Sequence, residues 1–148
     1  MKISEEMKEI IKNSYKFTIR PWTSVTGLSY IGYGHTIKDT ENFTYFPKKK
    51  CIELFDKDMK YVNRVANMLL GSQEIPQNHF DVFCSLIYEI GYQKVKGSSF
   101  FLLYKKGLIV ESSVRIMVWS KYRGVYSSAM EYRRKLDFKI FTTNNYET

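Results

Sequence analysis

Acidic side chains are missing from one long stretch of this chain. No Asp or Glu lies between Glu9 and Asp39, although the 148 residues include 15 acidic ones. The side chains of this stretch therefore cannot supply the carboxylate that general acid catalysis by Asp or Glu requires. Aromatic and β-branched residues are frequent there instead, and they favour β-strands.

Cysteine and histidine are also scarce. The two cysteines, Cys51 and Cys84, lie among apolar residues in helical patterns and lack the spacing of a disulfide framework. We expect both to be buried and unbridged. With only two histidines and no zinc-ligand or phosphate-loop spacing, the sequence predicts no metal and no cofactor.

Long hydrophobic runs are absent. No stretch approaches the ~20 apolar residues of a transmembrane helix, so we expect no membrane span. Residues 1–6 carry charges where a signal peptide needs an apolar run. We therefore expect a protein that is cytoplasmic as made and that leaves the cell, if it does, through a holin, a secretion system or lysis.

Positive charge is abundant. The net charge is +8, which favours an anionic partner such as cell wall, nucleic acid or an acidic protein. Two short basic clusters, residues 48–50 and 133–135, are interpreted as solvated helix faces, although Arg133 and Arg134 could also bind carbonyls or a nearby carboxylate. No RNA-binding aromatic motif accompanies the charge, so nucleic acid is disfavoured as a partner.

Apolar periodicity predicts a single α+β domain that acts as a monomer. Ser4 is a suitable N-cap for a helix to about Asn13. A short twisted sheet follows over residues 17–33, and a long helix begins at Pro47 and ends before Gly71. The pattern predicts further helices over residues 76–91, 98–107, 109–122 and 127–141. We therefore expect a hairpin lobe (about 14–46), a bridging helix (about 47–70) and a helical lobe (about 76–142, plus the N-terminal helix).

Residues 30–36 read YIGYGHT. This run resembles the Thr-Ile-Gly-Tyr-Gly-His signature of phage-type lysozymes, the small muramidases that cut peptidoglycan. Further segments match the family in order, at residues 54–58, 81–91, 98–107 and 129–141. The resemblance implies a lysozyme-like fold with two lobes joined by a long helix. Gly32 and Gly34 fit a sharp turn in which side chains would collide or φ must be positive.

The family's catalytic positions have changed in this chain. The family cuts with a Glu, an Asp and a Thr, and counting back from the signature places these at Tyr15, Ser24 and Tyr30. Glycoside hydrolysis needs a proton donor and a second carboxylate. A phenol of pKa about 10 is a poor donor at neutral pH, and Ser24 carries no charge. The resemblance therefore implies a pseudoenzyme with no catalytic residues at these positions.

The same register predicts a groove and an ion pair. Tyr15, Trp22, Tyr30 and Tyr33 would offer stacking faces to a sugar or a partner. Glu89 and Lys105, which both stand where the family has Asn, would line the groove as well. The resemblance also implies that His35 pairs with Asp58, which holds the hairpin lobe against the bridging helix.

Three functions remain open from the sequence. The chain could bind peptidoglycan or another anionic glycan without cutting it, or it could bind a host protein of a phage or bacterium. The alternative is an active muramidase with relocated acids, in which Glu89 or a tyrosine nucleophile takes part. Bulky tyrosines that could fill the groove favour the protein-binding function slightly over glycan binding.

Overall fold

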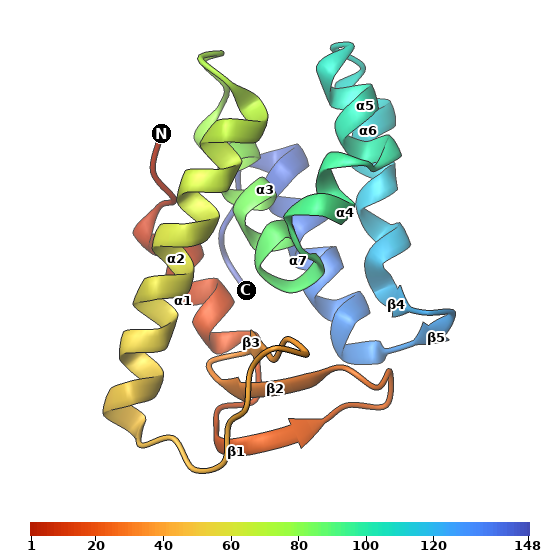
Figure 1. The fold of residues 1–148 in the computed structure, drawn as a ribbon. Coiled ribbons are helices and arrows are strands. Elements are labelled where there is room, and N and C mark those ends of the chain that lie inside the picture. The colour runs from red at the N-terminus through yellow and green to blue at the C-terminus, as the bar shows by residue number, and fades with distance from the viewer.

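A computed structural model describes all residues, Met1–Thr148. A small sheet lies at one end of the molecule and the helices stand beside and above it (Figure 1). The helices are α1 (Glu5–Asn13), α2 (Lys48–Leu70), α3 (Gln77–Ile90), α4 (Tyr92–Lys96), α5 (Ser99–Lys105), α6 (Ile109–Ser113), the 3₁₀ helix η1 (Val114–Ser120) and α7 (Ser128–Thr143). The strands are β1 (Thr18–Thr23), β2 (Ser29–Gly32), β3 (His35–Thr36), β4 (Lys121–Tyr122) and β5 (Val125–Tyr126).

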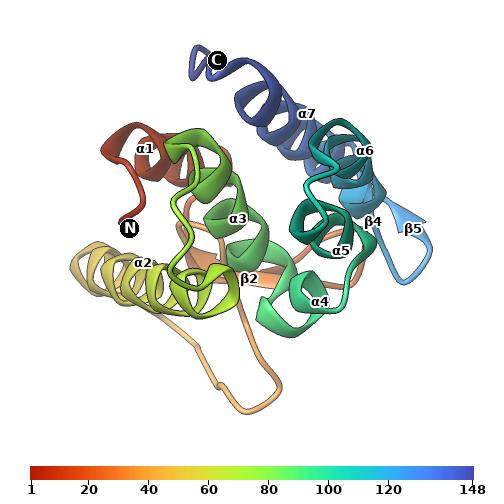
Figure 2. The ribbon, with the colours of Figure 1, turned by 90° about the horizontal axis from the view of Figure 1, so that it is seen from above.

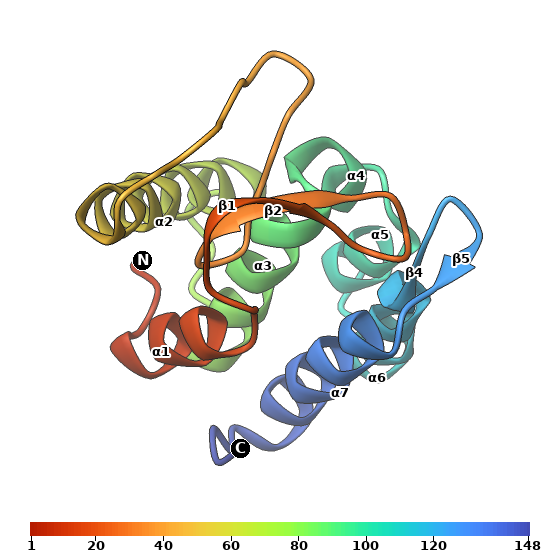
Figure 3. The same ribbon diagram turned by 90° about the horizontal axis from the view of Figure 1, so that it is seen from below.

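The first three strands form an antiparallel sheet in the order β1-β2-β3. Pro21 lies in β1, an edge strand. Proline is tolerated on an edge strand because its missing N–H can face solvent, where no neighbouring strand needs it. The register shifts between Thr18 and Trp22, so this part of β1 forms an irregularity in the pairing. Seen from below, β1 and β2 cross beneath the helices, and the turn between them points toward β4 and β5 (Figure 3).

Helix α2 runs from the sheet along the side of the molecule. It begins after Pro47 and ends at Gly71, whose φ of 68° is readily adopted by glycine. These bounds agree with the predicted helix over residues 47–70. Its inward face repeats at helical spacing, and the buried residues are Cys51, Phe55, Met59, Val62, Val65 and Ala66.

Helix α3 is the centre of the helical lobe. Eleven of its 14 residues are buried, including polar ones near both ends. A helix buried on all sides needs neighbours on all sides, and α3 lies between α1 and α2 on one side and α5, α6 and α7 on the other (Figure 2). Its C-terminal end faces the sheet, so Glu89 lies where the two lobes meet.

The segment after α5 differs from the prediction of one helix over residues 109–122. Helix α6 passes into η1, Trp119 has non-helical angles, and the chain then forms the β4–β5 hairpin. The two-residue turn between Tyr122 and Val125 contains Gly124, which has φ 79°. Helix α4 was not predicted, and α7 extends to Thr143 rather than Phe141.

Two further expectations concern the two cysteines and a membrane-spanning helix. Cys51 and Cys84 are buried and free, as predicted. None of the helices combines the length and the apolar character that crossing a membrane requires.

Candidate functional site

A cleft of about 750 Å³ lies between the sheet and the helical lobe. The β1–β2 turn and the loop after β3 form one wall, and the end of α3, α4, η1 and the β4–β5 hairpin form the other. A volume of this size is in the range of ligand-binding clefts. The charged and aromatic lining residues are Lys38, Asp39, Glu41, Glu89, Lys94, Trp119, Lys121, Tyr122 and Arg123.

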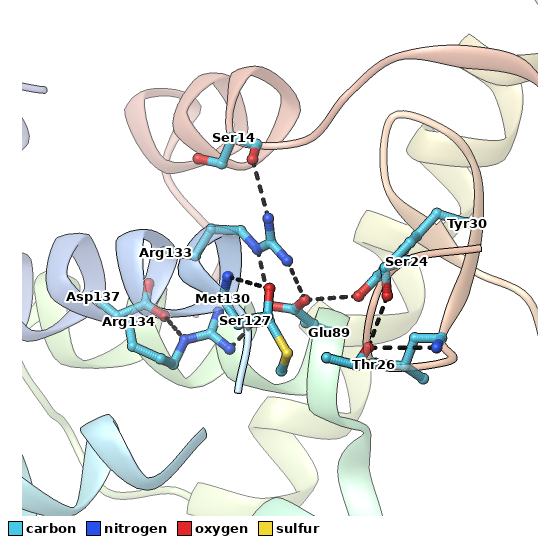
Figure 4. Close-up of polar contacts among 11 residues, drawn as sticks. Ser14, Ser24, Thr26, Tyr30, Glu89, Ser127, Met130, Arg133, Arg134 and Asp137 are labelled. Atoms are coloured by element: carbon cyan, nitrogen blue, oxygen red, sulfur yellow. Dashed lines mark hydrogen bonds and ion pairs between the residues drawn. The ribbon is translucent and has the colours of Figure 1, made fainter. Parts of the chain in front are cut away.

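Glu89 lies at the base of this cleft with its side chain fully buried. Its polar partners come from the sheet and from α7 (Figure 4). Arg133 Nε donates to Glu89 Oε1 at 3.0 Å, and Arg134 Nη1 lies 2.9 Å from the same oxygen. Tyr30 donates its hydroxyl to Glu89 Oε2 at 3.0 Å. Both carboxylate oxygens are therefore occupied by groups of the protein.

The charges around Glu89 decide its protonation. Burial raises the pKa of Glu89, but the guanidinium groups of Arg134 and Arg133 and the hydroxyl of Tyr30 outweigh burial and lower it. The carboxyl group is therefore ionised at neutral pH. A general acid needs the opposite change, a pKa raised toward the working pH.

Arg133 and Arg134 are buried, which corrects the prediction that they form a solvated helix face. Only Lys135 of this cluster is exposed. Besides Glu89, Arg134 bonds Asp137 through its Nε at 3.0 Å, and Arg133 donates to the backbone oxygen of Ser14 at 3.3 Å. The two arginines are buried because the acids they neutralise come from α3 and from the next turn of α7.

Tyr15 and Tyr30 lie side by side beneath the cleft, with ring centroids 6.0 Å apart. The ring of Tyr15 stands 4.1 Å from Arg133 Cζ. It also packs on Gly34, where a Cβ would overlap the ring. Burial, with the nearby charge of Glu89, raises the pKa of both phenols. Both hydroxyl groups therefore keep their protons near neutral pH.

Ser24 belongs to the turn after β1. Its hydroxyl lies 2.7 Å from Thr26 Oγ1, and its backbone N–H donates to Leu28 at 2.8 Å, so the side chain is held within the turn (Figure 4). Of the three positions that the resemblance equates with catalysis, Tyr15 and Tyr30 lie near Glu89 and Ser24 lies in the β1–β2 turn, and none of the three supplies a carboxylate.

Of the residues predicted to line one groove, only one lies in the cleft. Glu89 lies on the cleft floor, whereas the rings of Tyr15, Trp22, Tyr30 and Tyr33 are not part of the cleft lining. These rings pack on one another and on their neighbours: Trp22 contacts Tyr30, and Tyr33 contacts Phe17 and Phe55. Lys105 ends α5, where its amine lies over the ring of Phe101.

His35 and Asp58 form the predicted pair. His35 Nδ1 lies 2.7 Å from Asp58 Oδ2, which joins β3 to α2, and its Nε2 lies 3.0 Å from Glu41. Burial alone lowers the pKa of His35, but the hydrogen bonds and charges of Asp58 and Glu41 outweigh it and raise the pKa. When the imidazole is protonated, it bridges the two carboxylates and joins β3 to α2.

Sequence reasoning missed most of the cleft lining. Lys94, Trp119, Lys121, Tyr122 and Arg123 line one wall, and none of them was predicted as a site residue. The available signal was the run of alternating basic and aromatic residues, WSKYRGVY over residues 119–126. The sequence prediction ends a helix at residue 122, in the middle of this run, and so does not bring these side chains together on one wall.

Comparison with known proteins relates this geometry to a family. The chain matches the phage lysozyme family over residues 13–137. The endolysin of Bacillus phage B103 is 24% identical over 146 residues, covering 97% of this chain and 55% of that endolysin. The SAR-endolysin of Enterobacteria phage P21 is 24% identical over 120 residues, covering 81% of this chain and 72% of its own length. The chain therefore spans about half of the B103 relative.

Solved structures share the whole fold. The endolysin from Escherichia coli O157:H7 phage FAHEc1 superposes with a TM-score of 0.76 at 21% identity, covering 100% of this chain and 98% of its own. The muramidase domain of SpmX from Asticaccaulis excentricus also gives a TM-score of 0.76, at 23% identity and with 96% and 98% coverage. The predicted lysozyme-like α+β fold is thus confirmed, and because the family match covers most of its residues, the chain belongs to the phage lysozyme family.

Proposed function

We propose that this chain binds a cell-wall glycan in its cleft and does not hydrolyse it. Peptidoglycan is the leading candidate for this glycan. The observation that carries this is the state of Glu89. Its carboxylate lies near Tyr15 and Tyr30, two of the positions that the resemblance equates with catalysis, yet it is enclosed and bonded to Arg133, Arg134 and Tyr30. A carboxylate held ionised has no proton to give to a leaving oxygen, and an enclosed one cannot reach an anomeric carbon.

The tyrosines do not replace the missing acids. The pKa of Tyr15 and that of Tyr30 are raised by burial and by Glu89, so neither loses its proton readily. A tyrosine nucleophile would need a neighbouring base. The charged neighbours of these rings are instead Arg133 and Glu89, both of which are already engaged with each other.

Features that suit binding are retained. The cleft is open, and aromatic side chains of Trp119 and Tyr122 lie in its wall beside polar groups. Such rings give apolar faces to sugars and keep their polar tips hydrated. The chain's positive charge suits the anionic cell wall.

Binding is tested by cosedimentation with purified, insoluble peptidoglycan. We expect the protein to pellet with it, and Tyr122→Ala to weaken binding about fivefold through lost stacking area. Tyr132→Ala is the matched control, because Tyr132 is exposed on α7 and lies outside the cleft lining. Failure to pellet, combined with retention of a defined host protein by the same cleft, would favour the protein-binding function instead.

Cleavage by relocated acids is the second candidate function. Two observations favour it: the related phage proteins are endolysins, and Asp39 is exposed in the cleft wall. Glu41, in the same wall, is bonded by His35 and by the backbone of Lys38, which leaves Asp39 as the free carboxylate. Muropeptide release that disappears in Asp39→Asn would establish this function.

A further inference from the structure

The β4–β5 hairpin holds a residue in a conformation that its side chain does not favour. Arg123 has φ 50° and is followed by Gly124 with φ 79°, in a two-residue turn between the paired Tyr122 and Val125. Two positive φ angles define a turn whose first position favours Asn or Gly. An Arg at that position is strained. Its guanidinium makes no ion pair within the chain that would offset the strain, and it rests 5.2 Å from the ring of Tyr122.

Two other cations stand beside Arg123. Lys94, on α4, lies with its amine 4.4 Å from the ring centroid of Tyr122, and Lys121 precedes that ring in β4. All three side chains line the cleft, and none takes part in a salt bridge. They form a group of unpaired positive charges on one wall, around an aromatic ring.

The acids of the cleft do not cancel this charge. Glu89 is engaged by the two buried arginines, and Glu41 is engaged by His35. Asp39 remains free, but Lys38 lines the cleft beside it. Because cations lining a cleft raise the local concentration of anions, the open space attracts negatively charged ligands.

We infer that the β4–β5 hairpin recognises anionic groups carried on a glycan chain, with Arg123 as the specificity-determining residue. The inference rests on the proposed function and specifies its ligand. Trp119 and Tyr122 offer faces for sugar rings, and the guanidinium fork fits a carboxylate or a phosphate. The anion is either a carboxylate, as on the peptides of peptidoglycan, or a phosphodiester, as in phosphate-linked wall polymers.

The substitution Arg123→Asn separates a ligand role from a structural one. Asn is favoured at this turn position, so the variant removes the cation and relieves the strain. We expect the melting temperature to rise by a few degrees, while affinity for anionic chains falls about fivefold. If Arg123 served only to stabilise the β4–β5 hairpin, its replacement would instead lower the melting temperature. Lys106→Asn is the control, because it removes one positive charge outside the cleft lining.

Three soluble probes complete the test by calorimetry: a neutral chitin oligosaccharide, peptidoglycan strands with peptide carboxylates, and poly(N-acetylglucosamine 1-phosphate), in which phosphodiesters link sugar rings. We expect one anionic probe to bind more tightly than the neutral one, and only Arg123→Asn to remove that preference. The tighter of the two identifies the source of the anion. Equal binding of neutral and anionic probes, or equal losses in both variants, would overturn the inference and leave glycan binding intact. Binding of none of the probes, nor of insoluble peptidoglycan, would refute the proposed function itself.

An oligonucleotide of matched charge is the last probe. Binding as tight as that of the anionic glycans, and equally dependent on Arg123, would show that the hairpin recognises any polyanion. We expect weaker binding that falls with salt in both variants alike, since no aromatic row suited to stacked bases lines the cleft.

Discussion

Glu89 supplies negative charge to two buried arginines, and this role follows from where the neighbouring side chains stand. The sequence resemblance equates Tyr15 with the family's catalytic Glu, and in the structure its ring lies 4.1 Å from Arg133 Cζ. A carboxylate at position 15 would therefore face the same guanidinium that Glu89 now holds. The two positions are alternative sources of the same charge, and a chain with both acids would place like charges together in a buried site.

A double-mutant cycle tests this relation. Glu89→Gln removes the buried carboxylate that pairs with Arg133 and Arg134, and it should destabilise the fold by ~3–5 kcal/mol. Tyr15→Glu should also destabilise it, because the new carboxylate meets Glu89. We expect the free energy of unfolding of the double variant, measured in urea, to be at least ~2 kcal/mol higher than the value expected if the two single losses were additive. Tyr15→Gln with Glu89→Gln is the uncharged control. Additive effects in the charged cycle would show that the positions are independent.

Gly34 offers a second test on a single residue, because the structure supplies a matched control. Gly34 and Gly27 have φ of 87° and 89°, but only at Gly34 would a Cβ overlap the ring of Tyr15. Gly27→Ala should cost about 1–2 kcal/mol from the backbone alone. Gly34→Ala should cost ~3 kcal/mol or more, since it adds a collision. Equal losses in chemical denaturation would mean that Tyr15 does not pack on this glycine.

Among the elements, those with local signals were predicted well. Ser4 caps α1 by accepting from the N–H of Met7, Gly71 ends α2, and Ser98 caps α5. Each signal lies within a few residues of the boundary that it sets. The early sheet was also predicted, because periodicity of the helical kind is absent from residues 17–33.

The failures lie where distant residues decide the outcome. The pattern over residues 109–122 is compatible with a helix, but the chain leaves it at Trp119 and turns at Arg123 and Gly124. The burial of Arg133 depends on Glu89, which lies 44 residues away in sequence. Local patterns cannot reveal such a partner. They also do not show that the rings of Tyr15, Trp22 and Tyr30 pack on one another.

The His35–Asp58 contact between β3 and α2 predicts a pH dependence of stability. The pKa of His35 is raised above its ordinary 6.5 in the folded protein. The pair's contribution is therefore fully present below about pH 6.5 and is lost as pH rises through the folded pKa. We expect Asp58→Asn to destabilise the fold by ~2 kcal/mol at about pH 5.5 and by clearly less at about pH 8.5.

Asp56→Asn serves as the control for this experiment. Asp56 is exposed on the same helix and makes no ion pair, so its replacement should have a small effect that does not change between the two pH values. Urea unfolding of the wild type and both variants at the two pH values measures the difference. A cost of Asp58→Asn that is the same at both would contradict a charged pair.

At the scale of the whole molecule, the two lobes meet at a buried charge cluster beneath an open cleft. Tyr30 from the sheet, Glu89 from α3 and Arg133 from α7 share this cluster. This cluster therefore holds the sheet against the helices of the other lobe. The cleft above is open and is lined by Lys38, Lys94, Lys121 and Arg123, and the proposed glycan binding rests on this space and charge.

Release of soluble muropeptides from purified peptidoglycan, followed by chromatography near neutral pH, tests this account most directly. We predict that wild-type protein binds the peptidoglycan and releases no muropeptides above a buffer control, because Glu89 has no proton to donate and no route to the sugar. Sustained release by the wild type that is abolished by Glu89→Gln or by Asp39→Asn, in protein shown to be folded, would contradict the account and establish a working muramidase.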